Sequence, residues 1–162
     1  MKREHLVTYI DAAFDLTGAK TNYVKLGKDL TDLTMNMNPS VETTNNIWGE
    51  SNSRVYGYNV TADTNPYFVS HDESLSAKLM EIVDNELTGD DCLTTVVDVW
   101  LKRGATVDDP PTVVKAIRRE VLVAVQSYGG DNKGVNIPFS IHGSKNKVKG
   151  TFDIESNTFT AN

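Results

Sequence analysis

Histidine side chains are the first candidates for metal binding or catalysis in this sequence. His5, His71 and His142 are far apart, and no two of them have the i, i+2 or i, i+4 spacing that directs two imidazoles to one metal ion. An isolated histidine of this kind is typical of a protein surface. We therefore expect three surface histidines, no metal site and no cofactor.

Acidic pairs and a single cysteine are the other reactive groups. Asp90-Asp91 and Asp108-Asp109 supply carboxylates, but neither pair is followed by the twelve-residue ligand series, ending in a bidentate Glu, that a calcium loop requires. Cys92 follows Asp90 and Asp91, whose negative charge disfavours a thiolate, so we expect a packed and unreactive thiol. A carboxylate pair for glycoside hydrolysis is defined by a distance in space that the sequence does not give. Aromatic residues that could line a sugar cleft make up only 8% of the chain.

Sequence motifs of common enzymes are missing. The chain contains no Gly-x-Ser-x-Gly elbow, no phosphate-binding Walker loop and no Gly-x-Gly-x-x-Gly turn. The sequence therefore lacks the motifs on which acyl transfer and nucleotide chemistry usually depend. We predict that the protein is not an enzyme, with an unrecognised hydrolase left as a remote alternative.

Length and charge narrow the class of protein further. The chain has 162 residues, which favours one domain over residues 1–162. It carries 16 Lys and Arg against 22 Asp and Glu, a formal net charge of −6, and this balance disfavours a protein that grips nucleic-acid phosphates. The basic run Lys115, Arg118 and Arg119 alternates with apolar residues, so we interpret it as a solvated or subunit-contacting face.

Targeting and membrane signals are not evident. Glu4, His5, Asp11 and Asp15 interrupt the stretch where a secretory signal needs an apolar core. The longest aliphatic run, Val121–Val125, is far shorter than the roughly 20 residues of a membrane-spanning helix. We expect a soluble intracellular product.

The elements that would position any site are mainly β-strands. Val and Thr contribute 18 + 17 = 35 residues, and such β-branched side chains favour a pleated sheet. The stretch 113–119 is ambiguous, because Val113, Ile117 and Val121 also fit a helical stripe. The predicted strands cover 5–10, 22–26, 55–61, 94–101 and 121–125, with a final hairpin over 135–155 that turns at 143–146.

One helix is expected at about residues 72–87. Leu75, Leu79, Ile82, Val83 and Leu87 form an apolar stripe along one helical face. Ser70 and Glu73 have the spacing of a capping box, and Gly89 can adopt a left-handed conformation just beyond the end.

Two long polar segments lie between these elements. Residues 103–112 form a connection with two prolines, and residues 36–53 form a longer loop rich in Asn and Ser. A loop this long in a small domain is usually functional or disordered. Its apolar side chains favour a docking loop, and the candidate contact residues are Met37, Val41, Ile47 and Trp48.

Several short motifs occur along the chain in an order that resembles a known protein family. The matching pieces are Ser127-Tyr128-Gly129-Gly130-Asp131, Val148-Lys149-Gly150-Thr151-Phe152-Asp153 and Thr158-Phe159-Thr160-Ala161, with weaker support from Glu42-Thr43 and Tyr56-Gly57-Tyr58. Arranged over nearly the whole chain, they resemble the phage major tail protein, or tail tube protein, family. None of these motifs is chemically unique, and the resemblance lies in their order.

The resemblance implies a β-sandwich or barrel-like domain with a flanking helix. It implies a structural virion protein, made in the cytoplasm of a bacterial host, whose six-fold rings stack into the tail tube and conduct DNA. Its partners would be further copies of itself and the tape measure, tail terminator and distal tail or baseplate proteins. Residues 36–53 correspond in position to the loop that reaches a neighbouring ring. Six copies would carry 6 × −6 = −36 charges, and a lumen of that sign would repel DNA.

Two other functions remain open at this point. A tube of a phage-derived contractile bacteriocin or injection system would use the same subunit design. A monomeric β-sandwich module that binds a carbohydrate or protein ligand would instead stay monomeric and bind that ligand saturably.

Overall fold

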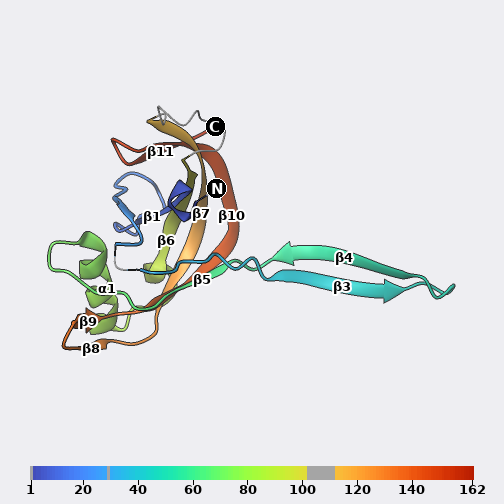
Figure 1. Ribbon diagram of the computed structural model, residues 1–162, viewed down its shortest axis with the longest axis horizontal. Helices are drawn as coiled ribbons and strands as arrows, with labels where there is room; N and C mark the ends of the chain where they lie inside the picture. Colours follow the sequence, from blue (N-terminus) through green and yellow to red (C-terminus); the bar gives the residue numbers. More distant parts are fainter. Residues whose placement is uncertain (1, 29, 102–111) are drawn as a thin grey trace.

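Antiparallel strands form most of the regular secondary structure among the described residues, and the predicted mainly β fold with one helix is confirmed (Figure 1). The computed structural model describes residues 2–28, 30–101 and 112–162. Within these residues the main sheet has the order β11-β10-β7-β6-β1-β2, with β5 also paired to β10. Its strands are β1 (Leu6–Asp11), β2 (Tyr23–Lys25), β5 (Thr61–Thr64), β6 (Leu93–Trp100), β7 (Val113–Val125), β10 (Phe139–Asp153) and β11 (Thr158–Ala161).

The remaining described elements lie around this sheet. Two further antiparallel pairs and three helical segments complete the described part of the chain. They are η1 (Arg3–His5), β3 (Pro39–Asn45), β4 (Ser51–Tyr58), α1 (Ser74–Asn85), η2 (Gly89–Cys92), β8 (Gly129–Asp131) and β9 (Gly134–Asn136). The predicted connection over 103–112 lies outside the described residues except for Thr112.

Several predicted strands are confirmed. The first two, at 5–10 and 22–26, correspond to β1 and β2, which pair with Tyr9 opposite Lys25. The ambiguous stretch 113–119 belongs to the strand β7, where Val114 and Ala116 are buried on one face of the sheet. The predicted strand over 55–61 is wrong as a single element, because β4 ends at Tyr58 and β5 begins at Thr61.

The predicted hairpin over 135–155 is also wrong. β10 runs through the expected turn as one strand of 15 residues, and β9 pairs with β8 instead. The residues expected to turn form an irregularity, where the register against β7 shifts between Gly143 and Lys147. Pairing with β7 on both sides of this irregularity overrides the local turn preference of the Gly-Ser-Lys-Asn sequence.

The predicted helix over 72–87 is confirmed as α1, but its ends differ. The capping box is not formed: Glu73 is the N-cap residue, its carboxylate accepts a hydrogen bond from Ser76 Oγ at 3.0 Å, and the Ser70 amide donates to the same Oγ at 3.1 Å. The left-handed residue at the C-cap is Glu86, with φ of 48°. Gly89 is also left-handed, with φ of 63°, as expected, but it opens η2 three residues beyond the C-cap.

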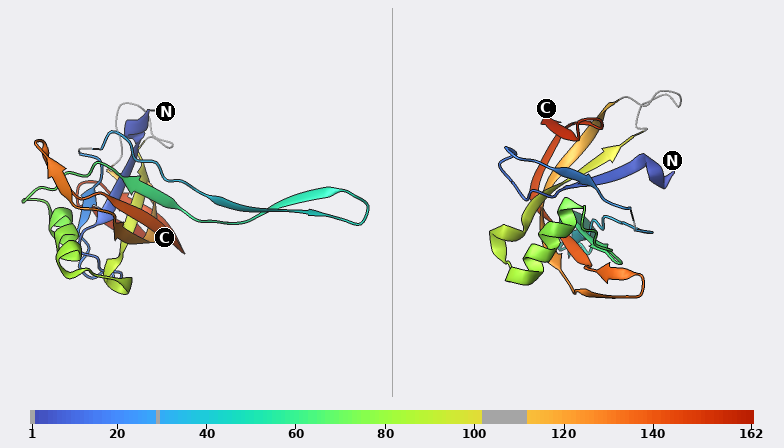
Figure 2. Two further views of the ribbon diagram at one scale, coloured as in Figure 1. Left: turned by 90° about the horizontal axis from the view of Figure 1, so that it is seen from below. Right: turned by 90° about the vertical axis from the view of Figure 1, so that its left-hand side faces the viewer.

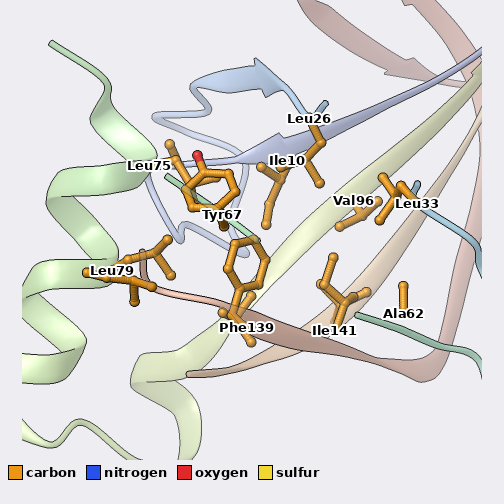
Figure 3. Packing of buried hydrophobic residues seen from close by; sticks show 14 residues of the cluster. Ile10, Leu26, Leu33, Ala62, Tyr67, Leu75, Leu79, Val96, Phe139 and Ile141 are labelled. Carbon is orange, nitrogen blue, oxygen red and sulfur yellow. The ribbon is translucent and has the colours of Figure 1, made fainter. Parts of the chain in front are cut away.

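Two hydrophobic cores lie on opposite faces of the sheet. Val96 belongs to the first and Val97 to the second, and successive residues of a strand point to opposite faces. The first core lies beneath α1, whose Leu75 and Leu79 side chains point toward Phe139 and Tyr67 (Figure 3). The second core gathers Tyr9, Tyr23 and Phe152 near the other end of the sheet. The same strands therefore hold both cores together.

Candidate assembly interface

A two-stranded arm extends away from the body of the protein (Figures 1 and 2). It consists of β3 and β4, which pair from Pro39 opposite Tyr58 to Asn45 opposite Ser51. The predicted irregular loop over 36–53 is thus corrected to a hairpin. Val and Thr residues in β3 favour extended backbone despite the many Asn and Ser residues around them. At about 3.3 Å per residue, the ten steps from Asn38 to Trp48 span roughly 33 Å.

Hydrogen bonds fix the tip of the arm. The side-chain oxygen of Asn46 accepts from the backbone amides of Trp48 at 3.0 Å and Glu50 at 2.9 Å, and its side-chain amide donates to Glu50 Oε2 at 2.7 Å. Gly49 supplies the left-handed residue of the turn, with φ of 81°. The result is an ordered turn on which Ile47 is 97% exposed and Trp48 is 81% exposed.

Hydrogen bonds also fix the base of the arm. The Asn38 side-chain amide donates to the Asn59 carbonyl at 2.9 Å and to Thr61 Oγ1 at 2.8 Å. Asn36 and Thr61 exchange backbone hydrogen bonds of 2.8 and 2.9 Å, which attach the base to β5. Because β5 belongs to the main sheet, the direction of the arm is set by the body.

The two faces of the arm differ in chemistry. Paired residues share a face, so Val41 and Val55 lie together on one face and the oppositely charged Glu42 and Arg54 on the other. All four side chains are exposed. Between this apolar pair and the tip, the same face carries the polar pairs Thr43–Ser53 and Asn45–Ser51.

Tyr56 and Tyr58 also contribute to the exposed surface of the arm, although the sequence did not predict this. The Tyr56-Gly57-Tyr58 alternation is more often cross-strand packing than a binding surface, yet both rings are exposed in β4. The register shifts next to Gly57, between Ser40 and Val41 of the partner strand, so Gly57 does mark a bulge. Nothing in the sequence separates them from ordinary cross-strand aromatics, and only their exposure in the structure identifies them.

The four predicted contact residues are spread along the arm. Met37 lies at the base, Val41 in β3, and Ile47 and Trp48 at the tip, and all four are exposed. The structure does not gather them into one cluster. A partner that contacts all of them must lie along the length of the arm.

An arm of this kind is poorly suited to remain alone in water. An isolated two-stranded hairpin is marginally stable, and Ile47 and Trp48 place two large apolar side chains next to each other in water at the tip, as is typical of an interaction site. Residues 36–58 contain only Glu42, Glu50 and Arg54 as charged residues. The arm is therefore the strongest candidate interaction surface of the described chain.

Reactive groups elsewhere do not converge in the described residues. No group of three or more His, Cys, Asp or Glu side chains there could hold a metal ion. Cys92 is buried, its thiol donates to the Leu87 carbonyl at 3.3 Å, and burial followed by the nearby Asp91 charge raises its pKa. The predicted packed thiol is confirmed. No helix in the same described residues is long and apolar enough to cross a membrane.

Asp98 is a largely buried carboxylate in β6, with its side chain 14% exposed. Burial raises the pKa of its carboxyl group, an effect opposed by a hydrogen bond from Thr8 Oγ1 at 2.9 Å and by Arg119, whose Nε lies 4.0 Å away. The native state therefore binds more protons than the unfolded chain between the ordinary aspartate pKa and the raised one.

Asp98→Asn should remove this part of the pH dependence of folding. Stability attributable to Asp98 is greatest at low pH and falls as the pH rises through the raised pKa. The free energy of unfolding of D98N relative to the wild type should therefore increase as the pH rises above the ordinary aspartate pKa of about 4. Urea denaturation at several pH values measures this difference. A difference that stays constant across the range would contradict the assignment.

Comparison with known proteins does not extend these observations. No protein-family model matches the chain, and a search of curated proteins finds no match.

Proposed function

We propose that this protein is a structural subunit that assembles with copies of itself into a tube, as the tail tube subunit of a bacteriophage. Its arm carries the proposal: an ordered hairpin that projects from the body and exposes Ile47 and Trp48 at its tip. A contact between this tip and a different surface of a second copy is heterologous, and heterologous contacts build closed rings or open-ended polymers.

The proposal in full is a stack of six-membered rings in the virion tail, through which DNA passes during delivery. Support comes from the mainly β body, the projecting arm and the order of sequence elements shared with tail tube proteins. Under this proposal the polymer itself is the active form, and the protein performs no catalysis. The tape measure, tail terminator and distal tail or baseplate proteins would meet the ends or the lumen of the tube.

Assembly of the purified wild type tests the proposal. Light scattering across a wide range of protein concentration should show a concentration above which large species form, and negative-stain microscopy should show rings or tubes. A protein that remains monomeric at high concentration and does not extend tail assemblies would contradict the proposal. That outcome would favour a monomeric ligand-binding module, which a saturable ligand would then identify.

A tube from a contractile bacteriocin or injection system would look the same in this assay. Co-assembly with a sheath protein distinguishes a contractile system from a tube without a sheath. The arm would serve the same contact in either system.

A further inference from the structure

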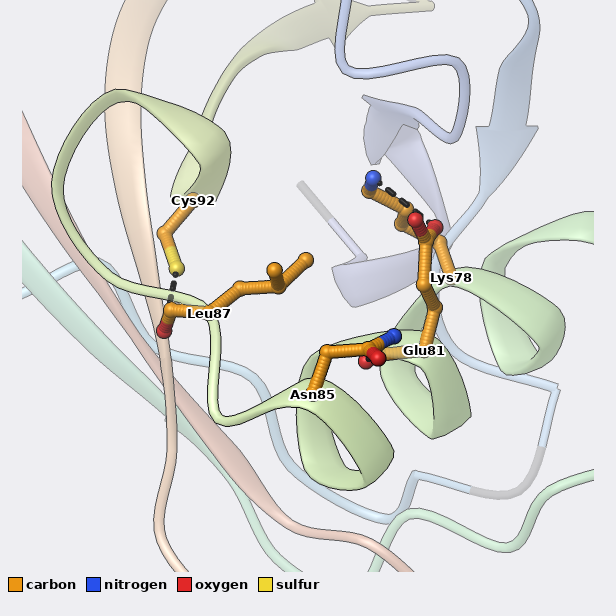
Figure 4. Close-up of polar contacts among 5 residues, drawn as sticks. All are labelled: Lys78, Glu81, Asn85, Leu87 and Cys92. Atoms are coloured by element: carbon orange, nitrogen blue, oxygen red, sulfur yellow. Dashed lines mark hydrogen bonds and ion pairs between the residues drawn. The ribbon is translucent and has the colours of Figure 1, made fainter.

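The net charge of the chain is concentrated in one segment. Residues 72–91 contain seven acidic residues and one lysine, so this acidic segment carries 1 − 7 = −6, and the remaining 15 acidic and 15 basic residues cancel. Lys78 Nζ lies 2.9 Å from Glu81 Oε2, so the lysine is already paired (Figure 4). The exposed acidic residues of the segment are Asp72, Glu81, Asp84, Glu86, Asp90 and Asp91.

Basic side chains gather on a different part of the sheet. Lys147 lies opposite Arg119 and Thr151 opposite Lys115 in the β7–β10 pair, so Lys115, Arg119, Lys147 and Lys149 share one face. These four residues define the basic surface. It includes a hollow of about 370 Å³ lined by Lys115, Lys149 and Trp100 among others.

The exposed lysines of the basic surface lack nearby carboxylates. Among the described residues, none of the ammonium groups of Lys115, Lys147 and Lys149 lies within 4.0 Å of a carboxylate oxygen. Two acidic residues share this face. Asp98 lies against Arg119 and Thr8, and Asp153 accepts the Glu155 amide at 3.0 Å. The three lysines therefore remain open to an external anionic partner.

The acidic segment lies near one end of β7, and the basic surface extends toward the other end of this strand. Leu122 of β7 shares a groove with Glu86 and Gly89 of the acidic segment, and Arg119 and Lys115 lie three and seven residues earlier. Three residues of strand span about 10 Å and seven about 23 Å, and both distances exceed the Debye length of about 8 Å at physiological salt. Figure 1 shows α1 and β11 at opposite ends of the sheet. The two charged surfaces of one copy therefore do not neutralise each other.

We propose that the basic surface of one copy binds the acidic segment of a second copy. This inference rests on the proposed self-assembly and adds a contact independent of the arm. Because the two surfaces differ and lie at opposite ends, the contact joins copies head to tail and can repeat. Under this inference the negative charge of the chain lies at a contact between subunits. The net charge alone therefore does not indicate that acidic residues line the lumen of the tube.

Charge complementarity gives this contact its direction. Exposed ion pairs add little affinity, but complementary patches steer association and reject partners that bring like charges together. A copy added in the reverse orientation would place two acidic segments or two basic surfaces against each other. The arm supplies apolar contact area, and the charged ends set the orientation. A nucleic acid is a poorer occupant of the basic surface, because it would have to approach a chain of net charge −6.

Two charge-reversed variants test the inference. The first carries Lys115→Glu, Lys147→Glu and Lys149→Glu, which changes the charge of the basic surface from +4 to −2. The second carries Asp72→Lys, Asp84→Lys, Glu86→Lys, Asp90→Lys and Asp91→Lys, which changes the charge of the acidic segment from −6 to +4. Each alone presents like charges at the contact, so the concentration needed for assembly should rise about tenfold or more at 0.1 M salt. In an equimolar mixture every contact can again join opposite charges, and the two variants should co-assemble in alternation at near the wild-type concentration.

A third variant controls for net charge. Lys20→Glu, Lys28→Glu and Lys133→Glu change exposed lysines outside the basic surface and give the same net charge of −6 − 6 = −12 as the first variant. It should assemble like the wild type, and circular dichroism should show that all three variants are folded. Loss of assembly in this control to the same degree would assign the effect to total charge and overturn the inference.

The outcomes separate this inference from the proposed function. If the wild type never assembles, the proposed function fails. If the wild type assembles and the first two variants assemble equally well, or their mixture is not rescued, the head-to-tail contact fails alone. Binding of a short DNA duplex that the first variant loses while it assembles normally would reassign the basic surface to nucleic acid and overturn the inference.

Discussion

Replacing both Ile47 and Trp48 by serine should abolish assembly and leave the body folded. The two side chains are 97% and 81% exposed, so their removal takes no contact from either core. Surface substitutions of this kind change folding stability by about 0.5 kcal/mol or less. Buried in an interface, each could contribute about 2 kcal/mol, and together they would shift the assembly concentration by roughly three orders of magnitude.

Sedimentation across protein concentration measures the first effect and urea denaturation the second. Val135→Ser is the matched control, because Val135 is an apolar residue 54% exposed in β9, outside the arm, the acidic segment and the basic surface. It should assemble like the wild type. Trp48→Ala alone should also reduce ring stacking far more than folding. Equal loss of folding and assembly would show that the tip is part of the folded core, contrary to its exposure.

Sequence could predict the elements whose signal is local and strong. The apolar stripe that includes Leu75 and Leu79 predicts α1 because both side chains must face the sheet, and they do. Short runs rich in apolar and β-branched residues predict β1, β2 and β6. In these elements the local periodicity and the position of the core agree.

The secondary structure of residues 36–58 and 135–155 depends on pairing between residues that are not neighbours in sequence. Gly143 and its neighbours favour a turn, but β7 supplies a partner strand along the whole of β10 and keeps the chain extended. The arm shows the opposite case, since its Asn and Ser residues suggest an irregular loop although hydrogen bonds across the strands make a hairpin. Neither outcome follows from local propensity.

The candidate interface was only partly visible in the sequence. Ile47 and Trp48 could be chosen because apolar residues in a polar stretch suggest docking. Tyr56 and Tyr58 could not, because alternating aromatics in a strand usually pack against a neighbour. The separation between the acidic segment and the basic surface could be recognised only from the register of β7 and β10. A net charge of −6 does not say where in the fold any charged residue lies.

The two cores explain why the body can hold so exposed an arm. Tyr9 and Ile10 are neighbours in β1 and enter opposite cores, as do Val97 and Val96 in β6. Each central strand is thus buried on both faces, and neither core can open without disturbing strands of the other. We therefore expect the body to unfold in a single cooperative transition.

Phe152→Ala should destabilise the body by about 3–5 kcal/mol, a large share of the roughly 5–15 kcal/mol typical of a domain. Phe152 is fully buried in the second core, with its ring centroid 4.5 Å from that of Tyr9 and 5.8 Å from that of Tyr23. Removing the ring leaves a cavity among residues of β1, β2 and β10, and β-pairing limits how far these strands can close it. Urea denaturation followed by circular dichroism measures the loss.

Tyr56→Ala provides the contrast, because it removes an aromatic ring of similar size from an exposed position in the arm. It should cost less than about 0.5 kcal/mol in folding, and a loss of assembly in this variant would show that a partner covers the arm at Tyr56. F152A should still unfold in one transition at a lower urea concentration, since both cores share β1, β6 and β10. Two separate transitions, with the first core still folded after the second has unfolded, would show that the cores fold independently. Such a body would be too flexible to hold the arm in a fixed direction.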